Sequence, residues 1–130
     1  MPTDGIIARA LELVPIDEVS RWLASAPDPI APFTERERAY AFSKSDPERR
    51  LAARLAAKRA ARAALDPTLT LDDFEVVPAR GGSPQLRLSE PAARRATERG
   101  VERALVSLTH GLTHAAALVL LVGSGHRGRR

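Results

Sequence analysis

The sequence predicts an α+β fold in which a mainly antiparallel sheet packs against one long helix. The predicted segments follow the order strand, helices, hairpin, helix and hairpin, rather than the strict alternation of parallel α/β proteins. The last predicted strand is a continuous apolar run, which is typical of a buried strand. The 130 residues are enough for one domain, which we place at residues 1–122. We expect the basic tail, residues 123–130, to be disordered.

The first third of the chain predicts one strand and two helices. Apolar residues are dense over residues 8–15, which predicts a strand, and a short helix is expected over residues 16–24. Thr34 and Glu37 are spaced as a capping box, in which each side chain binds the backbone N–H of the other. A second helix is therefore expected to begin here and to end near Ser43.

The remainder predicts a long helix and two hairpins separated by a fourth helix. Asp46 followed by Pro47 is a helix start signal, and this helix is expected to reach Leu65. A turn at residues 80–84 joins two alternating runs, as in a hairpin. The other expected elements are strands over 73–79 and 85–88, a helix over 89–100, and strands over 102–109 and 115–122.

The composition favours an anionic partner or ligand. The formal net charge is +4, and of the 20 basic residues only Lys44 and Lys58 are lysine. Arginine binds phosphate and carboxylate through a planar fork of donors; the alternative is a merely solvated basic surface. The absence of cysteine excludes disulfides, thiolate zinc sites and cysteine nucleophiles. The longest apolar run has eight residues, too few to span a membrane.

The long helix carries basic residues at a spacing of four. Arg50, Arg54, Lys58 and Arg62 therefore share one helix face, and Arg59 lies beside them. Like charges at this spacing repel one another, and a bound anion would relieve the repulsion. The alternative is a solvated basic face with the alanines packed inward.

Four stretches resemble a known family in their order and spacing. Residues 51–60 read LAARLAAKRA, residues 33–40 carry the pattern FTxxExxY, residues 82–84 read GSP, and residues 107–110 read SLTH. Together they resemble the 4′-phosphopantetheinyl transferases of the holo-acyl-carrier-protein synthase type.

This resemblance implies a function. Family members transfer 4′-phosphopantetheine from coenzyme A, their substrate, to a serine of an apo acyl or peptidyl carrier protein. A Mg²⁺ ion on the pyrophosphate neutralises the charge that develops as the bond breaks. The resemblance further implies a cytoplasmic homotrimer with its site between subunits, for fatty acid or polyketide biosynthesis.

The resemblance also implies site residues. Glu12 matches a metal-binding aspartate, whereas Arg59 stands where the family has its metal-binding glutamate, so the Mg²⁺ site is incomplete. Glu12, Lys58 and Arg59 are the expected catalytic residues. The expected coenzyme-binding residues are Arg54, Lys58, Arg62, Ser107, Thr109 and His110.

Two interpretations of Arg59 remain open. In the first, its guanidinium replaces part of the metal's charge and the chain is a transferase. In the second, the chain is a degenerate homologue that binds coenzyme A, a carrier protein or another subunit without turnover. Glu37, Asp17 and Glu18 are the candidates for a compensating acid. Nucleic-acid binding through the basic helix and tail is a third and less favoured class, because 4% aromatic content leaves little stacking surface.

Overall fold

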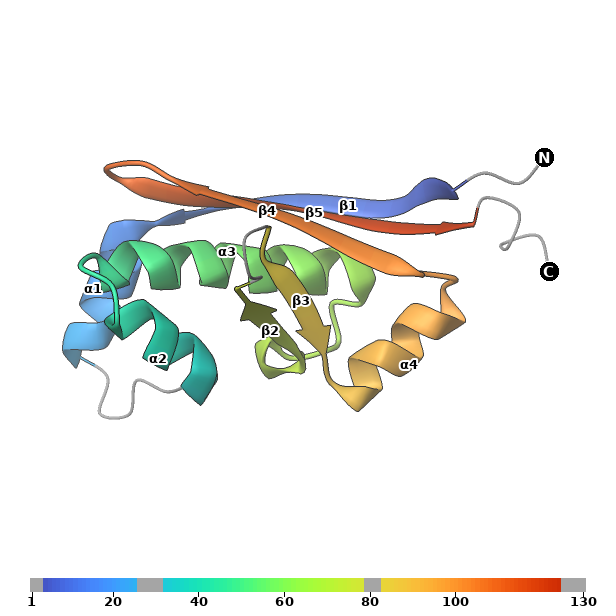
Figure 1. Cartoon of the computed structure of the whole chain (residues 1–130), viewed down its shortest axis with the longest axis horizontal. Coiled ribbons are helices and arrows are strands. Elements are labelled where there is room, and N and C mark those ends of the chain that lie inside the picture. Colours follow the sequence, from blue (N-terminus) through green and yellow to red (C-terminus); the bar gives the residue numbers. More distant parts are fainter. Residues whose placement is uncertain (1–3, 26–31, 79–82, 125–130) are drawn as a thin grey trace.

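The computed structural model describes residues 4–25, 32–78 and 83–124, and it confirms the predicted α+β class. Figure 1 shows the arrangement of the elements. In chain order these are β1 (Asp4–Pro15), α1 (Ile16–Ser25), α2 (Glu35–Phe42), α3 (Pro47–Leu65), the 3₁₀ turn η1 (Leu71–Asp73), β2 (Phe74–Val77), β3 (Gln85–Leu88), α4 (Glu90–Glu98), β4 (Arg103–His110) and β5 (His114–Ser124). The predicted basic tail, residues 123–130, begins within β5, which extends to Ser124, and its remainder lies outside the described residues. Most of the predicted turn at 80–84 also lies outside the described residues.

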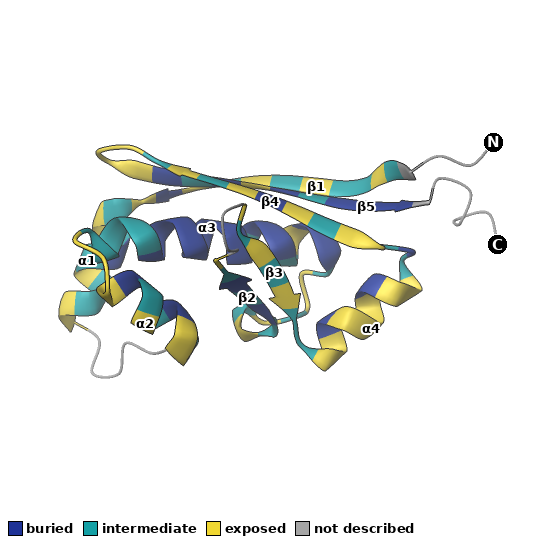
Figure 2. Cartoon of the chain, in the orientation of Figure 1, coloured by how far each residue is buried: buried dark blue, intermediate teal, exposed yellow. Residues whose placement is uncertain are grey.

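Two antiparallel sheets pack around the long helix. The larger sheet has the order β1-β5-β4, and the smaller one is the β2-β3 hairpin. In Figure 1, α3 lies beneath the larger sheet, with α1, α2 and the hairpin on its other side. Because α3 is covered on several sides, most of its residues from Leu51 onward are buried, as the dark blue ribbon in Figure 2 shows.

Alanine makes this close packing possible. The helix α3 buries a run of small side chains against the sheet, which lets the backbones approach. The buried alanines of α3 are Ala52, Ala53, Ala56, Ala57, Ala60, Ala61 and Ala64. On the sheet side, Val14 of β1 and Val119 of β5 are fully buried on the face that packs against the helix.

The larger sheet has one covered and one uncovered face. Side chains alternate along β1, so Val14 faces the core while Leu11 and Leu13 are exposed. Leu118 of β5 pairs with Leu11 in the register and is exposed on the same face. The outer face of the sheet is therefore an apolar surface. No helix within the described ranges is long and apolar enough to cross a membrane.

A pair of opposed glycines gives a first stability prediction. Gly5 and Gly123 are partners across β1 and β5. A Cβ atom on Gly123 would collide with the carbonyl oxygen of Gly100, whereas one on Gly5 would meet no atom within 4 Å. We expect Gly123→Ala to lower the free energy of unfolding by about 1–3 kcal/mol, and Gly5→Ala to change it by less than about 0.5 kcal/mol.

Urea unfolding of the two variants at one protein concentration measures this difference. Both substitutions add the same methyl group to the same strand pair, so they control for alanine content and strand propensity. Equal unfolding midpoints for the two variants would show that the Gly123–Gly100 approach does not constrain the fold.

Candidate functional site

The basic side chains of α3 are not uniformly exposed to solvent. Arg54 and Lys58 are buried, and the only buried acid in the described ranges is Glu37 of α2. The Lys58 ammonium donates a hydrogen bond of 2.8 Å to Glu37 Oε1, and both side chains are fully buried. The alternative of a solvated basic face is therefore wrong for this part of α3, because α2 and the β2-β3 hairpin cover it.

Glu37 joins three elements through one carboxylate. Besides Lys58, its Oε1 accepts the backbone N–H of Thr34 at 2.9 Å, which completes the predicted capping box. Its Oε2 accepts the backbone N–H of Val76 in β2 at 2.7 Å. With these partners Glu37 is committed to the core, so it is not a free acid that could compensate for a missing metal ligand.

Lys58 faces the core in this arrangement. Its side chain has no exposed surface and its ammonium is held by Glu37. The predicted contact of Lys58 with a phosphate remains a prediction, and it would require the Glu37 pair to open.

Arg54 is a buried cation with an aromatic neighbour and no acid partner. Its guanidinium carbon lies 4.4 Å from the centre of the Tyr40 ring on α2. Its Nε is buried without a hydrogen-bond partner, and no carboxylate of the described ranges forms an ion pair with it. Burial lowers the pKa of Arg54 below its usual value, an effect that nearby Tyr40 and Glu37 oppose.

Arg59 points to α1 and pairs with Glu18. Its guanidinium donates to Glu18 Oε2 at 2.7 Å, and about a third of each side chain is exposed, 32% and 37% respectively. The pair borders a small cavity of about 120 Å³ that Trp22, Phe33 and Leu55 help to line. The neighbouring acid, Asp17, pairs with Arg21 at 2.6 Å. Both candidate acids of α1 are therefore already paired with arginines.

Glu12 lies on the α3-facing side of β1. Its side chain alternates with the exposed Leu11 and Leu13 and is half-buried. Mg²⁺ prefers oxygen ligands in octahedral geometry, but the second expected ligand position holds Arg59, whose guanidinium repels cations. In the part of the chain that the structure describes, no three acidic or histidine side chains group to hold a metal. Within the described ranges Glu12 is therefore the one expected carboxylate ligand, so the expected Mg²⁺ site is incomplete there.

The expected coenzyme-binding residues of β4 lie on different faces of the sheet. Ser107 and Thr109 are exposed on the outer face, while the half-buried His110 has the core-facing parity of Val106. His110 is near the start of α3, where the Arg50 hydrogen bond and, more weakly, His110 hold the pKa of Asp46 below its usual value.

A single chain consequently does not assemble the predicted site. Arg54 and Arg59 lie beneath the sheet and Ser107 and Thr109 lie above it. Arg62 is half-buried one turn beyond Lys58 on α3.

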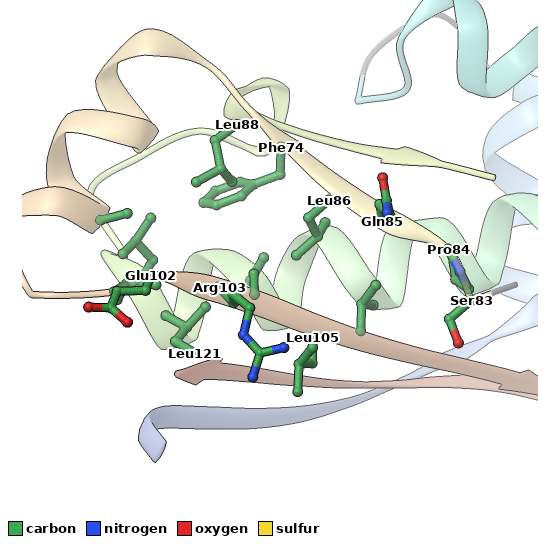
Figure 3. A pocket seen from close by; sticks show the side chains of 16 residues that line it. Phe74, Ser83, Pro84, Gln85, Leu86, Leu88, Glu102, Arg103, Leu105 and Leu121 are labelled. Atoms are coloured by element: carbon green, nitrogen blue, oxygen red, sulfur yellow. The ribbon is translucent and has the colours of Figure 1, made fainter. Parts of the chain in front are cut away.

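A larger apolar cleft lies away from these residues. It has a volume of about 890 Å³ and opens between β3 and β4, with Phe74, Leu86 and Leu121 in its walls. Figure 3 shows Phe74 and Leu86 on the β2-β3 hairpin and Leu121 on β5 among the side chains that line the cleft. None of the predicted site residues lines this cleft.

Sequence reasoning missed two pairings at the candidate site. The partner of Arg59 is Glu18, 41 positions away, and no local pattern indicates it. The stacking of Arg54 on Tyr40 was also missed. The one available signal was that Tyr40 follows the capping-box Glu37 by three residues, which places both on one helix face.

Comparisons with known proteins show which proteins this chain is similar to in sequence and in fold. The chain is 37% identical over 126 residues to a holo-acyl-carrier-protein synthase of Anaeromyxobacter sp. (strain K), covering 92% of this chain and 98% of that protein. No protein-family model matches the chain.

Two solved structures are similar over most of their length. The acyl carrier protein synthase of Mycobacterium tuberculosis is 32% identical with a TM-score of 0.72, covering 90% of this chain and 97% of that one. The ACPS–CoA complex of Chronobacterium ammoniagenes is 29% identical with a TM-score of 0.74, covering 89% and 96%.

Proposed function

This chain belongs to the holo-acyl-carrier-protein synthase family of 4′-phosphopantetheinyl transferases, and from that premise we propose that it transfers 4′-phosphopantetheine from coenzyme A to a serine of an apo carrier protein. The observation that carries the proposal is similarity along nearly the whole length of curated synthases. The coenzyme-bound relative supports coenzyme A as the substrate. The proposed partner is an acyl or peptidyl carrier protein, and the proposed location is the cytoplasm.

The proposed reaction exchanges one bond to phosphorus for another. The serine hydroxyl oxygen forms a bond to the β-phosphorus of coenzyme A, and the bond from that phosphorus to the bridging oxygen breaks. The serine proton must be removed, and 3′,5′-ADP leaves with the electron pair of the broken bond. Catalysis of such a step is mainly positioning and neutralisation of the developing charge.

Arg59 is the residue that we propose to neutralise the pyrophosphate. Its side chain is partly exposed and is held by a single carboxylate, Glu18, so an anion of higher charge can compete for it. An arginine fork binds two phosphate oxygens at once. Glu12, half-buried and without a basic partner among the described residues, is the proposed acceptor of the serine proton. Lys58 supports the site from the core.

We propose that the site is completed between subunits of a homotrimer. Ser107 and Thr109 share the outer face of the sheet with the exposed Leu11, Leu13 and Leu118. An exposed apolar surface of this kind is typical of protein interfaces. Association through it would bring the outer-face residues of one copy close to a neighbour, and it would bury the leucines.

A second candidate function is binding without turnover. The observation that favours it is that each candidate compensating acid already forms an ion pair with a basic side chain. The pairs are Glu37 with Lys58, Glu18 with Arg59 and Asp17 with Arg21. In this alternative the chain binds coenzyme A, a carrier protein or another subunit, but the developing charge is not neutralised well enough for transfer.

Intact-mass spectrometry tests the two functions directly. The full chain is incubated with coenzyme A, Mg²⁺ and several apo carrier proteins, beside an active synthase as the positive control. A mass increase of one phosphopantetheine is the expected result. If only the control synthase modifies the carriers, the transferase proposal fails and the binding function is favoured.

A further inference from the structure

The buried charges around α3 do not cancel. The buried charged residues of the described ranges are Glu37, Arg54 and Lys58, two cations and one anion. Glu37 and Lys58 satisfy one another directly. Arg54, which is only 5% exposed, has no carboxylate partner within residues 4–25, 32–78 and 83–124, and its Nε has no hydrogen-bond partner there. A buried charge without a partner is unfavourable, so this position is suited to an external anion.

Tyr40 is the aromatic side chain on which the Arg54 guanidinium packs. The ring centre of Tyr40 lies 4.4 Å from the Arg54 guanidinium carbon and 5.0 Å from the Lys44 ammonium. Both separations are within the range of cation–π attraction. Tyr40 belongs to α2 and Arg54 to α3, so the ring links the two helices at the cation. A guanidinium packed on a ring face keeps its in-plane N–H donors available for an anion.

We propose that Tyr40 is a positioning residue that holds the Arg54 guanidinium in register with a phosphate group of the bound nucleotide, with Lys44 as a second cation beside the same ring. The proposal rests on the proposed function for the identity of the ligand, a nucleoside phosphate. It adds to that function an aromatic residue that acts through Arg54 and does not itself touch the reacting atoms. The bound phosphate would offset the buried charge of Arg54.

Two variants of Tyr40 separate the ring from the hydroxyl. Tyr40→Leu removes the aromatic face, and we expect it to weaken binding of 3′,5′-ADP about tenfold, the loss of one partly buried cation–π contact. In the transfer assay it should raise KM for coenzyme A by a similar factor and leave kcat within about twofold. Tyr40→Phe keeps the ring and should restore near wild-type values of both.

The matched control lies on the same helix. Phe42 is an aromatic residue of α2 that is 53% exposed, and no cation stacks on it in the described residues. Phe42→Leu should bind 3′,5′-ADP like the wild type. If Tyr40→Leu fails to fold, as judged by circular dichroism, Lys44→Gln replaces it, because Lys44 is exposed. This variant should weaken 3′,5′-ADP binding about threefold without changing the unfolding temperature.

Calorimetric titration of the full chain with 3′,5′-ADP distinguishes the inference from the proposed function. Binding that Tyr40→Leu weakens and Tyr40→Phe preserves supports the inference, even if no carrier protein is ever modified. The inference is overturned if the wild type does not bind 3′,5′-ADP. It is also overturned if Tyr40→Leu binds as tightly as the wild type, or if Tyr40→Phe is as defective as Tyr40→Leu. If the chain is an active transferase and gives any of these results, the proposed function stands and only the proposed role of Tyr40 fails.

Discussion

Replacing Glu37 by glutamine is expected to cost about 3–5 kcal/mol of the free energy of unfolding, which is the usual consequence of breaking a buried ion pair from one side. The change leaves the Lys58 ammonium fully buried without its counter-charge. It also weakens the acceptor for the backbone N–H groups of Thr34 and Val76. Urea unfolding followed by circular dichroism, at one protein concentration, measures the loss.

Two companion variants identify the cause of that loss. Asp17→Asn breaks an ion pair whose side chains are 76% and 72% exposed, and it should cost less than about 1 kcal/mol. Glu37→Gln combined with Lys58→Met removes both buried charges and should recover much of the stability, because an apolar side chain then occupies the apolar space. A double variant no more stable than Glu37→Gln alone would show that the backbone hydrogen bonds, and not the charge pair, dominate.

Replacing Arg59 by alanine is expected to lower kcat of phosphopantetheine transfer about 10²–10³-fold, the usual effect of removing one group that neutralises transition-state charge. The proposed role of Arg59 is to bind the pyrophosphate as charge develops on the leaving 3′,5′-ADP. Initial rates of carrier-protein modification, followed by intact mass, measure the change. Wild-type kcat in Arg59→Ala would contradict the proposed role.

The charge of Arg59 and its ion pair with Glu18 are tested by separate variants. Arg59→Lys keeps a cation but loses the fork, so it should fall between the wild type and Arg59→Ala. Glu18→Gln removes the acid that holds Arg59, and it should leave kcat unchanged or raise it.

Restoring the carboxylates of the family pattern gives an independent test, with Mg²⁺ binding as the measured quantity. Arg59→Glu combined with Glu12→Asp restores the two carboxylates of the family pattern, and this double variant should bind Mg²⁺ in a calorimetric titration where the wild type does not. If the wild type proves inactive, gain of transfer by the double variant would mean that these two positions account for the loss. No Mg²⁺ binding would show that the surrounding residues also differ.

Local signals predicted most of the secondary structure. Asp46-Pro47 begins α3 and Leu65 ends it, at the predicted residues. The capping box of Thr34 and Glu37 forms as expected. These predictions succeeded because a helix start depends on contacts over three or four residues, which the sequence displays directly.

The pairing of charges was not predictable in the same way. The sequence places Lys58 on a basic helix face, but its partner Glu37 is 21 positions away, and Glu18 is 41 positions from Arg59. Whether a basic residue is solvated or buried depends on which elements cover it, and that follows from the order β1-β5-β4 and from the placement of α2 on α3.

The sequence by itself therefore determined the α+β class, the bounds of α3, the family resemblance and the arginine at position 59. Only the tertiary structure decided that Glu37 forms a buried ion pair with Lys58 and that Arg54 stacks on Tyr40. It also decided that Ser107 and Thr109 lie on the face of the sheet opposite to the helix. The reason is physical: helix and strand signals are carried by near neighbours in the chain, whereas burial and ion pairing arise between elements that meet only when the chain is folded.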